Sequence, residues 1–243
     1  MMSDARAVGR AVALAAALSV ALLGGCDRDA PPAAKGRAPA AADQPAARSD
    51  PGAQADRRPA LVFLGDSLTA GFGLAAEESV PALIQGDVDR AGLGLRVINA
   101  GRSGDTTAGG KSRVDYYLRR EIAPRALVVW LGANDIMRGL PTAEIEANLR
   151  AIIQRAHQFD RGLAVFVVQM RAFPNLGADY ARAFEDIFPR VAKSEDATLL
   201  PFPLADVAGR PELNQADGIH PTAEATRTVA DDLWRALRPA LAH

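Results

Sequence analysis

Residues 61–71 read LVFLGDSLTAG, and this stretch decides the expected fold. Its first four residues, Leu61–Leu64, form a short and continuously apolar run, which is typical of a strand covered on both faces of a sheet. The glycine, aspartate and serine that follow are residues that favour a turn. The stretch therefore predicts a buried strand that presents Ser67 at its carboxyl end.

Four more apolar runs of this kind predict further strands: Arg96–Asn99, Ala126–Leu131, Leu163–Gln169 and Thr198–Phe202. Helical patterns lie between and after them, opening at Thr142 after Pro141 and covering Ala178–Lys193 and Thr222–Leu237. Strands that alternate with helices predict an α/β fold, a three-layer α/β/α sandwich around a five-stranded parallel sheet. In such sheets ligands bind beyond the carboxyl ends of the strands.

The N-terminal residues predict export. Arg6 and Arg10 precede an apolar run at 11–23, which is too short to span a bilayer comfortably and fits the core of a secretory signal. Two glycines and Cys26 follow, and this arrangement resembles a bacterial lipobox, which implies cleavage before Cys26 and lipid attachment to it. An ordinary signal peptide with an incidental cysteine is the alternative.

The next segment has a composition that disfavours folding. Residues 26–58 contain 11 Ala and 5 Pro but no Val, Ile, Leu, Phe, Tyr or Trp, so they cannot bury enough apolar surface to offset the cost of ordering. The sequence thus predicts a lipoprotein signal peptide at 1–25, a disordered tether at 26–58 and a folded domain at 59–243. The expected location is the periplasmic side of a bacterial membrane, held there by the lipid anchor.

Composition excludes several kinds of partner. The 28 Lys and Arg residues nearly balance the 29 Asp and Glu residues, so no general electrostatic reason exists to bind nucleic acid. A single cysteine excludes an internal disulfide and a Cys-rich metal site. We expect a monomer that needs no metal and no cofactor.

Polar blocks follow four of the predicted strands: Gly65–Gly71, Gly101–Thr106, Gly132–Asp135 and Asp217–Pro221. In this order they resemble the SGNH, or GDSL-type, serine hydrolase superfamily, and most closely its bacterial periplasmic thioesterase, lysophospholipase and arylesterase branch. The resemblance covers essentially the whole of 59–243. It implies a flavodoxin-like SGNH hydrolase fold and an esterase activity without a cofactor.

The chemistry of an activated serine selects the same residues. A serine hydroxyl is a poor nucleophile until a neighbouring base takes its proton. His157 falls inside a predicted helix and His243 is the last residue, which leaves His220 as the expected base for Ser67. Asp217 lies three residues before His220 and is expected to orient the imidazole.

The resemblance also implies an oxyanion hole. It assigns the backbone N–H groups of Ser67 and Gly104 and the side-chain amide of Asn134 as donors to the oxyanion. The alternative is that Gly104 and Asn134 only serve their turns, a common role for both residue types. Asp66 and Asp105 are expected to organise their loops.

Two segments after the third and fourth strands, 136–141 and 170–177, are expected to frame an acyl pocket. Its candidate residues are Met137, Leu140, Met170 and Phe173, which could equally anchor loops in the core. The implied substrates are short- to medium-chain acyl esters, aryl esters, thioesters or lysophospholipids. A carbohydrate O-acetylesterase on the same fold is the alternative, followed by a non-catalytic binding lipoprotein.

A nucleotide-binding loop is a weaker reading of residues 104–112, which end in Gly-Lys-Ser. A phosphate loop requires four residues between its glycines, whereas five separate Gly104 from Gly110. The Gly-x-Ser-x-Gly elbow of the other serine hydrolase fold does not occur in the sequence.

Overall fold

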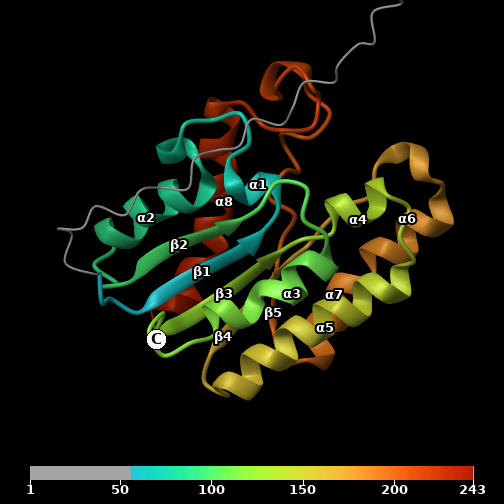
Figure 1. The fold of residues 1–243 in the computed structure, drawn as a ribbon. Coiled ribbons are helices and arrows are strands. Elements are labelled where there is room, and N and C mark those ends of the chain that lie inside the picture. The colour runs from blue at the N-terminus through green and yellow to red at the C-terminus, as the bar shows by residue number, and fades with distance from the viewer. Residues whose placement is uncertain (1–55, 243) are drawn as a thin grey trace, which may run out of the picture. The chain divides into compact units, whose positions relative to one another are not determined.

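The computed structural model describes residues 56–242, and the strands of this part form one parallel sheet. The strands are β1 (Ala60–Gly65), β2 (Arg96–Gly101), β3 (Pro124–Trp130), β4 (Ala164–Val168) and β5 (Thr198–Leu200). Their order across the sheet is β2-β1-β3-β4-β5, which places β1 in the interior (Figure 1). All five predicted strands are confirmed, with ends that differ by no more than a few residues.

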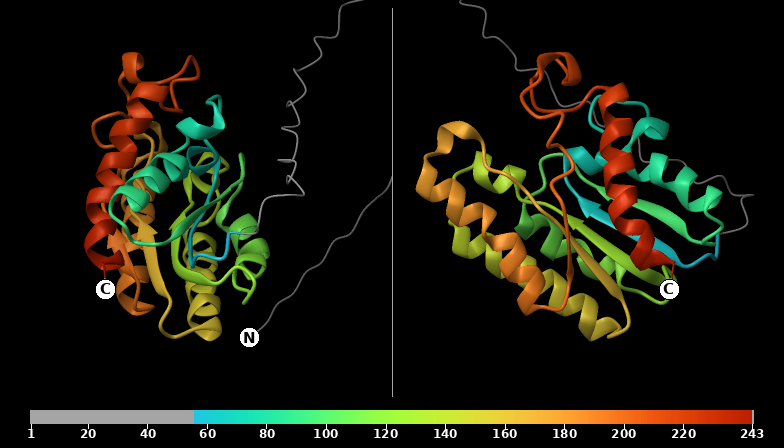
Figure 2. Two further views of the ribbon diagram at one scale, coloured as in Figure 1. Left: turned by 90° about the vertical axis from the view of Figure 1, so that its left-hand side faces the viewer. Right: turned by 180° about the vertical axis from the view of Figure 1, so that it is seen from behind.

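Helices cover both faces of the sheet, so the predicted three-layer sandwich is confirmed (Figures 1 and 2). Helices α2 (Val80–Arg90) and α8 (Ala223–Leu241) pack against each other on one face. On the other face α3 (Thr107–Tyr117) packs against α5 (Thr142–Phe159), which also contacts α7 (Ile187–Ser194). The shorter elements are α1 (Ser67–Ala70), α4 (Ala133–Met137), α6 (Ala178–Glu185) and the 3₁₀ turns η1 (Ala76–Glu78), η2 (Pro174–Leu176) and η3 (Pro211–Leu213).

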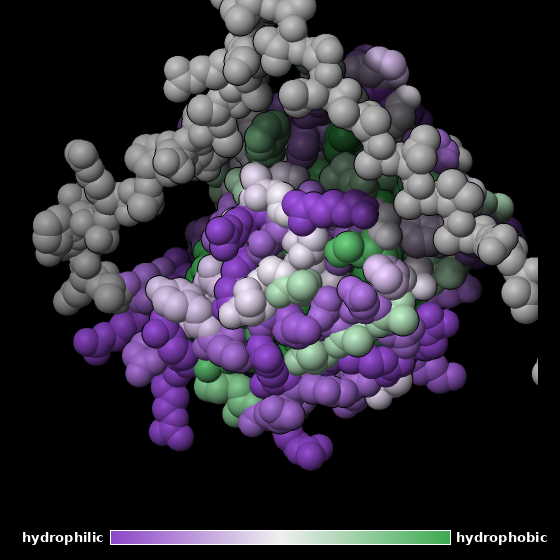
Figure 3. Space-filling view, turned by 45° about the vertical axis from the view of Figure 1, so that its right-hand side comes forward, coloured by the Kyte–Doolittle hydropathy of each residue, from purple (hydrophilic) through white to green (hydrophobic). Residues whose placement is uncertain are grey.

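The core forms where these layers meet. Every residue of β1 is buried, as expected for a strand with helices on both faces. Helix α5 contributes the apolar face that its spacing predicts: Ile145, Leu149, Ile152, Ile153 and Ala156 are all fully buried. Full burial of a Leu or Ile side chain stabilises a fold by about 1.5–3 kcal/mol. In contrast, the outer face shown in Figure 3 is mainly hydrophilic, with only small hydrophobic patches.

One expected helix is broken. The sequence pattern predicts a continuous helix over Ala178–Lys193, whereas the structure ends α6 at Glu185 and starts α7 at Ile187. The cause is Pro189, whose ring would clash with the carbonyl of Glu185 four residues earlier in an unbroken helix. That carbonyl accepts a hydrogen bond of 3.0 Å from Gln169 Nε2 instead.

The predicted signal peptide at 1–25, Cys26 and the tether up to residue 55 lie outside the described residues. Within residues 56–242, no helix combines the length and the apolar character needed to cross a membrane.

Candidate active site

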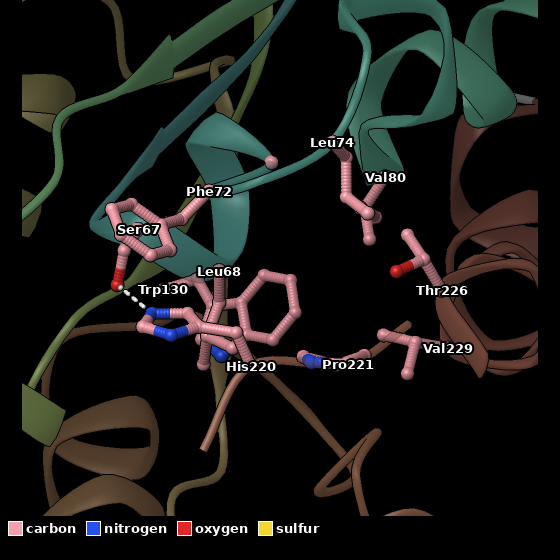
Figure 4. A pocket seen from close by; sticks show the side chains of 11 residues that line it. Ser67, Leu68, Phe72, Leu74, Val80, Trp130, His220, Pro221, Thr226 and Val229 are labelled. Atoms are coloured by element: carbon pink, nitrogen blue, oxygen red, sulfur yellow. Dashed lines mark hydrogen bonds between the residues drawn. The ribbon is translucent and has the colours of Figure 1, made fainter. Parts of the chain in front are cut away.

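Ser67 stands at the carboxyl end of β1, where the chain turns sharply into α1 (Figure 4). Asp66 caps this short helix by accepting a 3.0 Å hydrogen bond from the N–H of Leu68. Gly65 makes the turn possible, because a Cβ there would lie only 1.9 Å from Thr69 Oγ1. The GDSL stretch therefore folds into a tight strand-to-helix turn that brings the serine to the sheet edge.

The structure brings Ser67, His220 and Asp217 into one hydrogen-bonded chain. His220 Nε2 lies 2.8 Å from Ser67 Oγ (Figure 4). On the other side of the ring, His220 Nδ1 lies 2.6 Å from Asp217 Oδ2. The other carboxylate oxygen of Asp217 accepts hydrogen bonds from the backbone N–H groups of Ile219 (2.9 Å) and His220 (3.0 Å). This is the geometry in which an imidazole can draw a proton from a hydroxyl while a carboxylate orients it.

The electrostatics of Asp217 favour its ionised form. Partial burial by itself would raise the pKa of its carboxyl group. The hydrogen bonds from His220 and from the Ile219 backbone outweigh burial and lower the pKa to about 2. Asp217 is therefore a carboxylate at neutral pH, and as an acceptor beside Nδ1 it favours the tautomer with the proton on Nδ1, in which Nε2 faces Ser67 as an acceptor.

The segment that carries His220 differs from the expectation in one respect. The sequence places the Asp217 block directly after the fifth strand, but β5 ends at Leu200 and a long irregular segment precedes Asp217. An isolated antiparallel bridge between Asn214 and Pro221 closes the end of this segment. Asn214 Nδ2 also donates to two backbone carbonyls, each at 2.8 Å, so side-chain hydrogen bonds replace a regular element here.

The loop that carries Gly104 is held by an arginine. Gly104 adopts a left-handed backbone (φ 81°), and the neighbouring Asp105 carboxylate lies 2.6 Å from Arg113 Nε. Arg113 also donates to the carbonyls of Ala100 (2.7 Å) and Gly65 (2.9 Å) at the ends of β2 and β1. Arg113 thus ties the Gly104 loop to the strand that presents Ser67, and the sequence pattern gave no signal for this role.

Asn134 lies near the start of α4, next to the end of β3, and its side chain points toward the GDSL turn. It is 8% exposed, and its Nδ2 donates to Asp66 Oδ2 at 3.4 Å. The N-cap of α4 is Gly132, and no side chain caps this helix. The amide of Asn134 therefore lies beside Asp66, the residue before Ser67, and does not cap the helix that carries Asn134.

Two buried carboxyl groups lie beneath these loops. Burial raises the pKa of Asp66 to about 7, and the nearby carboxylates of Asp135 and Asp105 add to this effect. Burial also raises the pKa of Asp135, against hydrogen bonds that it accepts from the N–H (2.9 Å) and hydroxyl (2.6 Å) of Thr107. As expected, Asp66 and Asp105 organise their loops.

Because Asp66 is buried, its ionisation should make the free energy of unfolding depend on pH. Asp66→Asn should remove this contribution. Because the pKa of Asp66 is higher in the folded state, folding favours the protonated form. The contribution of Asp66 is complete below its unfolded value of 3.8 and is lost as pH rises to about 7. Asparagine stays neutral, so the free energy of unfolding of the variant minus that of the wild type should increase with pH over this range, by up to roughly 4 kcal/mol.

Urea unfolding of both proteins at a series of pH values between 4 and 8 measures this difference. A difference that does not change with pH would show that Asp66 titrates alike in the folded and unfolded chains.

An apolar pocket of about 360 Å³ opens next to the residues that flank Ser67 and His220. Leu68 and Ile219, the neighbours of Ser67 and His220, contribute to its wall. Of the predicted pocket residues, Met170 and Phe173 line it. Met137 and Leu140 do not belong to its lining, since Met137 is 47% exposed on α4.

Phe202 and Leu204 also line this pocket, although the sequence pattern does not predict them there. They lie in the irregular segment after β5, where no periodic pattern marks a buried face. Leu68 and Ile219 could have been found from their positions next to the candidate catalytic residues.

The Gly-Lys-Ser sequence at 110–112 lies inside α3 and does not form a phosphate-binding loop. Lys111 contacts Asn148 Oδ1 on α5. Among residues 56–242, no group of three or more His, Cys, Asp or Glu side chains is placed to hold a metal ion.

Known proteins resemble this chain over most of its length. Residues 63–227 match the model of the GDSL-like lipase/acylhydrolase family. The chain is 37% identical to esterase TesA of Pseudomonas aeruginosa over 74% of its own length and 89% of the relative. It is also 37% identical to thioesterase 1/protease 1/lysophospholipase L1 of Escherichia coli K12, over 75% of this chain and 85% of the relative.

A solved structure has a similar fold. The psychrotrophic esterase EstA from Pseudoalteromonas sp., in a structure inhibited by monoethylphosphonate, superposes with a TM-score of 0.71 at 29% identity. The match covers 76% of this chain and 99% of EstA. The fold, the matched residues and these relatives together show that the chain belongs to the GDSL-like lipase/acylhydrolase family.

Proposed function

We propose that this carboxylic ester hydrolase works through a covalent acyl-enzyme at Ser67, with His220 as the base and Asp217 as the residue that orients it. The observation that supports the proposal most strongly is the unbroken chain of hydrogen bonds from Asp217 through His220 to Ser67 Oγ. A serine activated in this way is the nucleophile that acyl transfer requires.

The proposed reaction uses these groups in turn. Ser67 Oγ attacks the acyl carbonyl as His220 Nε2 takes the hydroxyl proton, and the carbonyl oxygen becomes an oxyanion. The N–H groups of Ser67 and Gly104 and the amide of Asn134 stabilise this oxyanion, a type of contribution worth about 10²–10³-fold in rate for each donor.

His220 next gives its proton to the leaving alcohol or thiol as the bond to the acyl carbon breaks. In deacylation His220 takes a proton from water, the resulting hydroxide attacks the acyl carbon, and Ser67 recovers its proton as the acid leaves. Every proton therefore passes through Nε2, the nitrogen that faces Ser67.

The pocket beside Ser67 supports the substrate class. Its volume of about 360 Å³ lies within the range of about 300–1,000 Å³ that is usual for small-molecule sites. Its lining is largely apolar, with Met170, Phe173 and Phe202 among the larger side chains, which suits an acyl chain better than a sugar. We therefore favour short- to medium-chain acyl esters, aryl esters, thioesters or lysophospholipids over acetylated carbohydrates.

A fluorophosphonate probe and a substrate panel test this function. We expect stoichiometric labelling of Ser67, lost in Ser67→Ala, and hydrolysis of p-nitrophenyl acyl esters of graded chain length and of acyl-CoA. Faster release of acetate from acetylated sugars would favour the O-acetylesterase. A wild type that binds acyl esters but neither reacts with the probe nor hydrolyses them would favour the binding lipoprotein.

Export and lipid attachment are part of the same proposal, and they rest on the charged and apolar pattern before Cys26. In a bacterial host with lipoprotein processing, Cys26→Ser should move the protein from the membrane fraction to the soluble fraction, because the acylated thiol is lost. Its kcat on p-nitrophenyl esters should equal that of the wild type. Unchanged membrane fractionation of the variant would contradict the anchor.

A further inference from the structure

Phe72, which lies just after α1, contacts both Ser67 and His220. Its backbone N–H donates to the carbonyl of Ser67 at 3.1 Å. Its ring packs on the imidazole of His220 with 4.6 Å between ring centroids and 36° between ring planes (Figure 4). Phe72 is 44% exposed, so core packing alone does not account for its position.

Gln215 connects the Phe72 loop to the His220 loop. Its Nε2 donates to the carbonyl of Phe72 at 2.8 Å and to the carbonyl of Pro221 at 2.9 Å. Its backbone N–H donates to the carbonyl of His220 at 2.7 Å. One side chain therefore joins two loops that are 143 positions apart in the sequence.

The glycines on both sides of Phe72 allow this contact. Gly71 and Gly73 have left-handed backbones, with φ of 78° and 75°. A Cβ at Gly73 would lie 2.2 Å from Gln215 Oε1, so only glycine lets the chain approach the glutamine this closely. The loop is thus shaped to meet Gln215.

The hydrogen bonds among Asp217, His220 and Ser67, here called the triad, do not by themselves explain how the His220 loop is held next to Ser67. Asp217 belongs to the same irregular segment as His220, so their hydrogen bond fixes the ring relative to its own loop. It does not fix that loop relative to Ser67, which stands on the GDSL turn. Phe72 and Gln215 bridge these two parts of the chain.

We propose that Phe72 and Gln215 form a clasp that holds His220 at hydrogen-bonding distance from Ser67, and that both are positioning residues for acyl transfer. The inference rests on the function proposed for Ser67 and His220. A misplacement of about 1 Å can cost about 10²-fold in rate, so a partial loss of the clasp should slow acylation measurably.

The first test compares Gln215→Met with Gln85→Met. Methionine keeps the length of the side chain but cannot donate to the two carbonyls. Like Gln215, Gln85 makes two side-chain hydrogen bonds to backbone groups outside its own element, donating to the carbonyl of Leu95 and accepting from the N–H of Val97, and neither involves Ser67, His220 or Asp217, which makes it a matched control.

We expect Gln215→Met to lower kcat on a p-nitrophenyl ester by about 10-fold with little change in KM, and Gln85→Met to leave kcat unchanged. The rate of fluorophosphonate labelling should fall with kcat. In that reaction the Ser67 Oγ–P bond forms, the P–F bond breaks, fluoride leaves and His220 takes the hydroxyl proton. All rates are compared well below the unfolding temperature of each variant.

The second test changes the Phe72 loop instead of Gln215, so its result does not depend on whether Gln215→Met folds. Gly73→Ala and Gly92→Ala both place alanine on a left-handed backbone, but Gly92 (φ 66°) has open space around it. Gly73→Ala should lose activity and Gly92→Ala should not, although both lose stability. Phe72→Ala should slow labelling, and Phe72→Tyr, which keeps the ring, should restore most of it.

The outcomes separate the clasp from the function on which it rests. If the wild type is not labelled at Ser67, the proposed function fails. If the wild type is labelled and both Gln215→Met and Gly73→Ala react as fast as their controls, the clasp is wrong and the esterase mechanism stands.

Discussion

Ser67→Ala and His220→Ala should each lower kcat by about 10⁶-fold, and the double variant should lose little more. In the proposed mechanism the two side chains carry out a single proton transfer across their 2.8 Å hydrogen bond, so removing either one removes the step. The residual rate above that of water comes from the remaining oxyanion donors and from substrate binding. Hydrolysis of a p-nitrophenyl ester by the two single variants and the double variant measures the effect.

His157→Ala is the matched control, because this histidine lies on α5 and has no place in the proposed mechanism. It should retain full activity. If the losses of the two single variants multiply in the double variant, the two residues act independently and the acyl-enzyme mechanism in its present form is rejected.

Asp217→Asn should lower kcat by about 10⁴-fold with the fold intact. An asparagine oxygen can still accept from the N–H groups of Ile219 and His220, so the turn should persist. The amide, however, would donate to Nδ1 and favour the tautomer that carries its proton on Nε2. That nitrogen could then no longer accept the proton of Ser67.

The low pKa of Asp217 adds a pH test. Its value of about 2 keeps the carboxylate charged at any pH above about 4, and its contribution to stability is lost only as pH falls from 3.8 toward 2. The wild-type rate should therefore show no step from Asp217 between pH 5 and 9.

Asp160→Asn is the control for Asp217→Asn, because it alters a similar turn carboxylate bonded to the N–H of Gly162, and it should be fully active.

A small loss in Asp217→Asn, comparable with that of Asp160→Asn, would show that the backbone alone orients His220. In that case Asp217 would be a turn residue and not part of the proton transfer.

Much of the fold was predictable because its strands are short apolar runs followed by turn residues. Leu61–Leu64 is the clearest, and the structure extends it by only one residue at each end. Helix α3 was not located, because it contains Gly109 and Gly110 and has no marked apolar face. A Cβ at Gly110 would lie 2.3 Å from Leu131 Cδ1, so close packing against the sheet, and not helix propensity, explains this glycine.

The candidate site likewise contains residues that could be predicted from the sequence and residues that could not. Ser67, Asp217 and His220 could be proposed because each lies in a short block whose chemistry is local. Phe72 and Gln215 could not, since their contact depends on a fold that joins distant loops. Met137 was expected in the pocket from its place after the third strand, but α4 buries Asn134, Asp135 and Ile136 and leaves Met137 exposed.

The separation of Ser67 and His220 along the chain has a consequence for biosynthesis. The proposed nucleophile, Ser67, follows β1, whereas the proposed base, His220, comes 153 residues later, shortly before α8. A nascent chain that has emerged only as far as β5 holds the serine but has no base to activate it. Under the proposed mechanism, hydrolysis can begin only once nearly the entire polypeptide has been made, so a truncated product would be unable to attack cellular acyl esters.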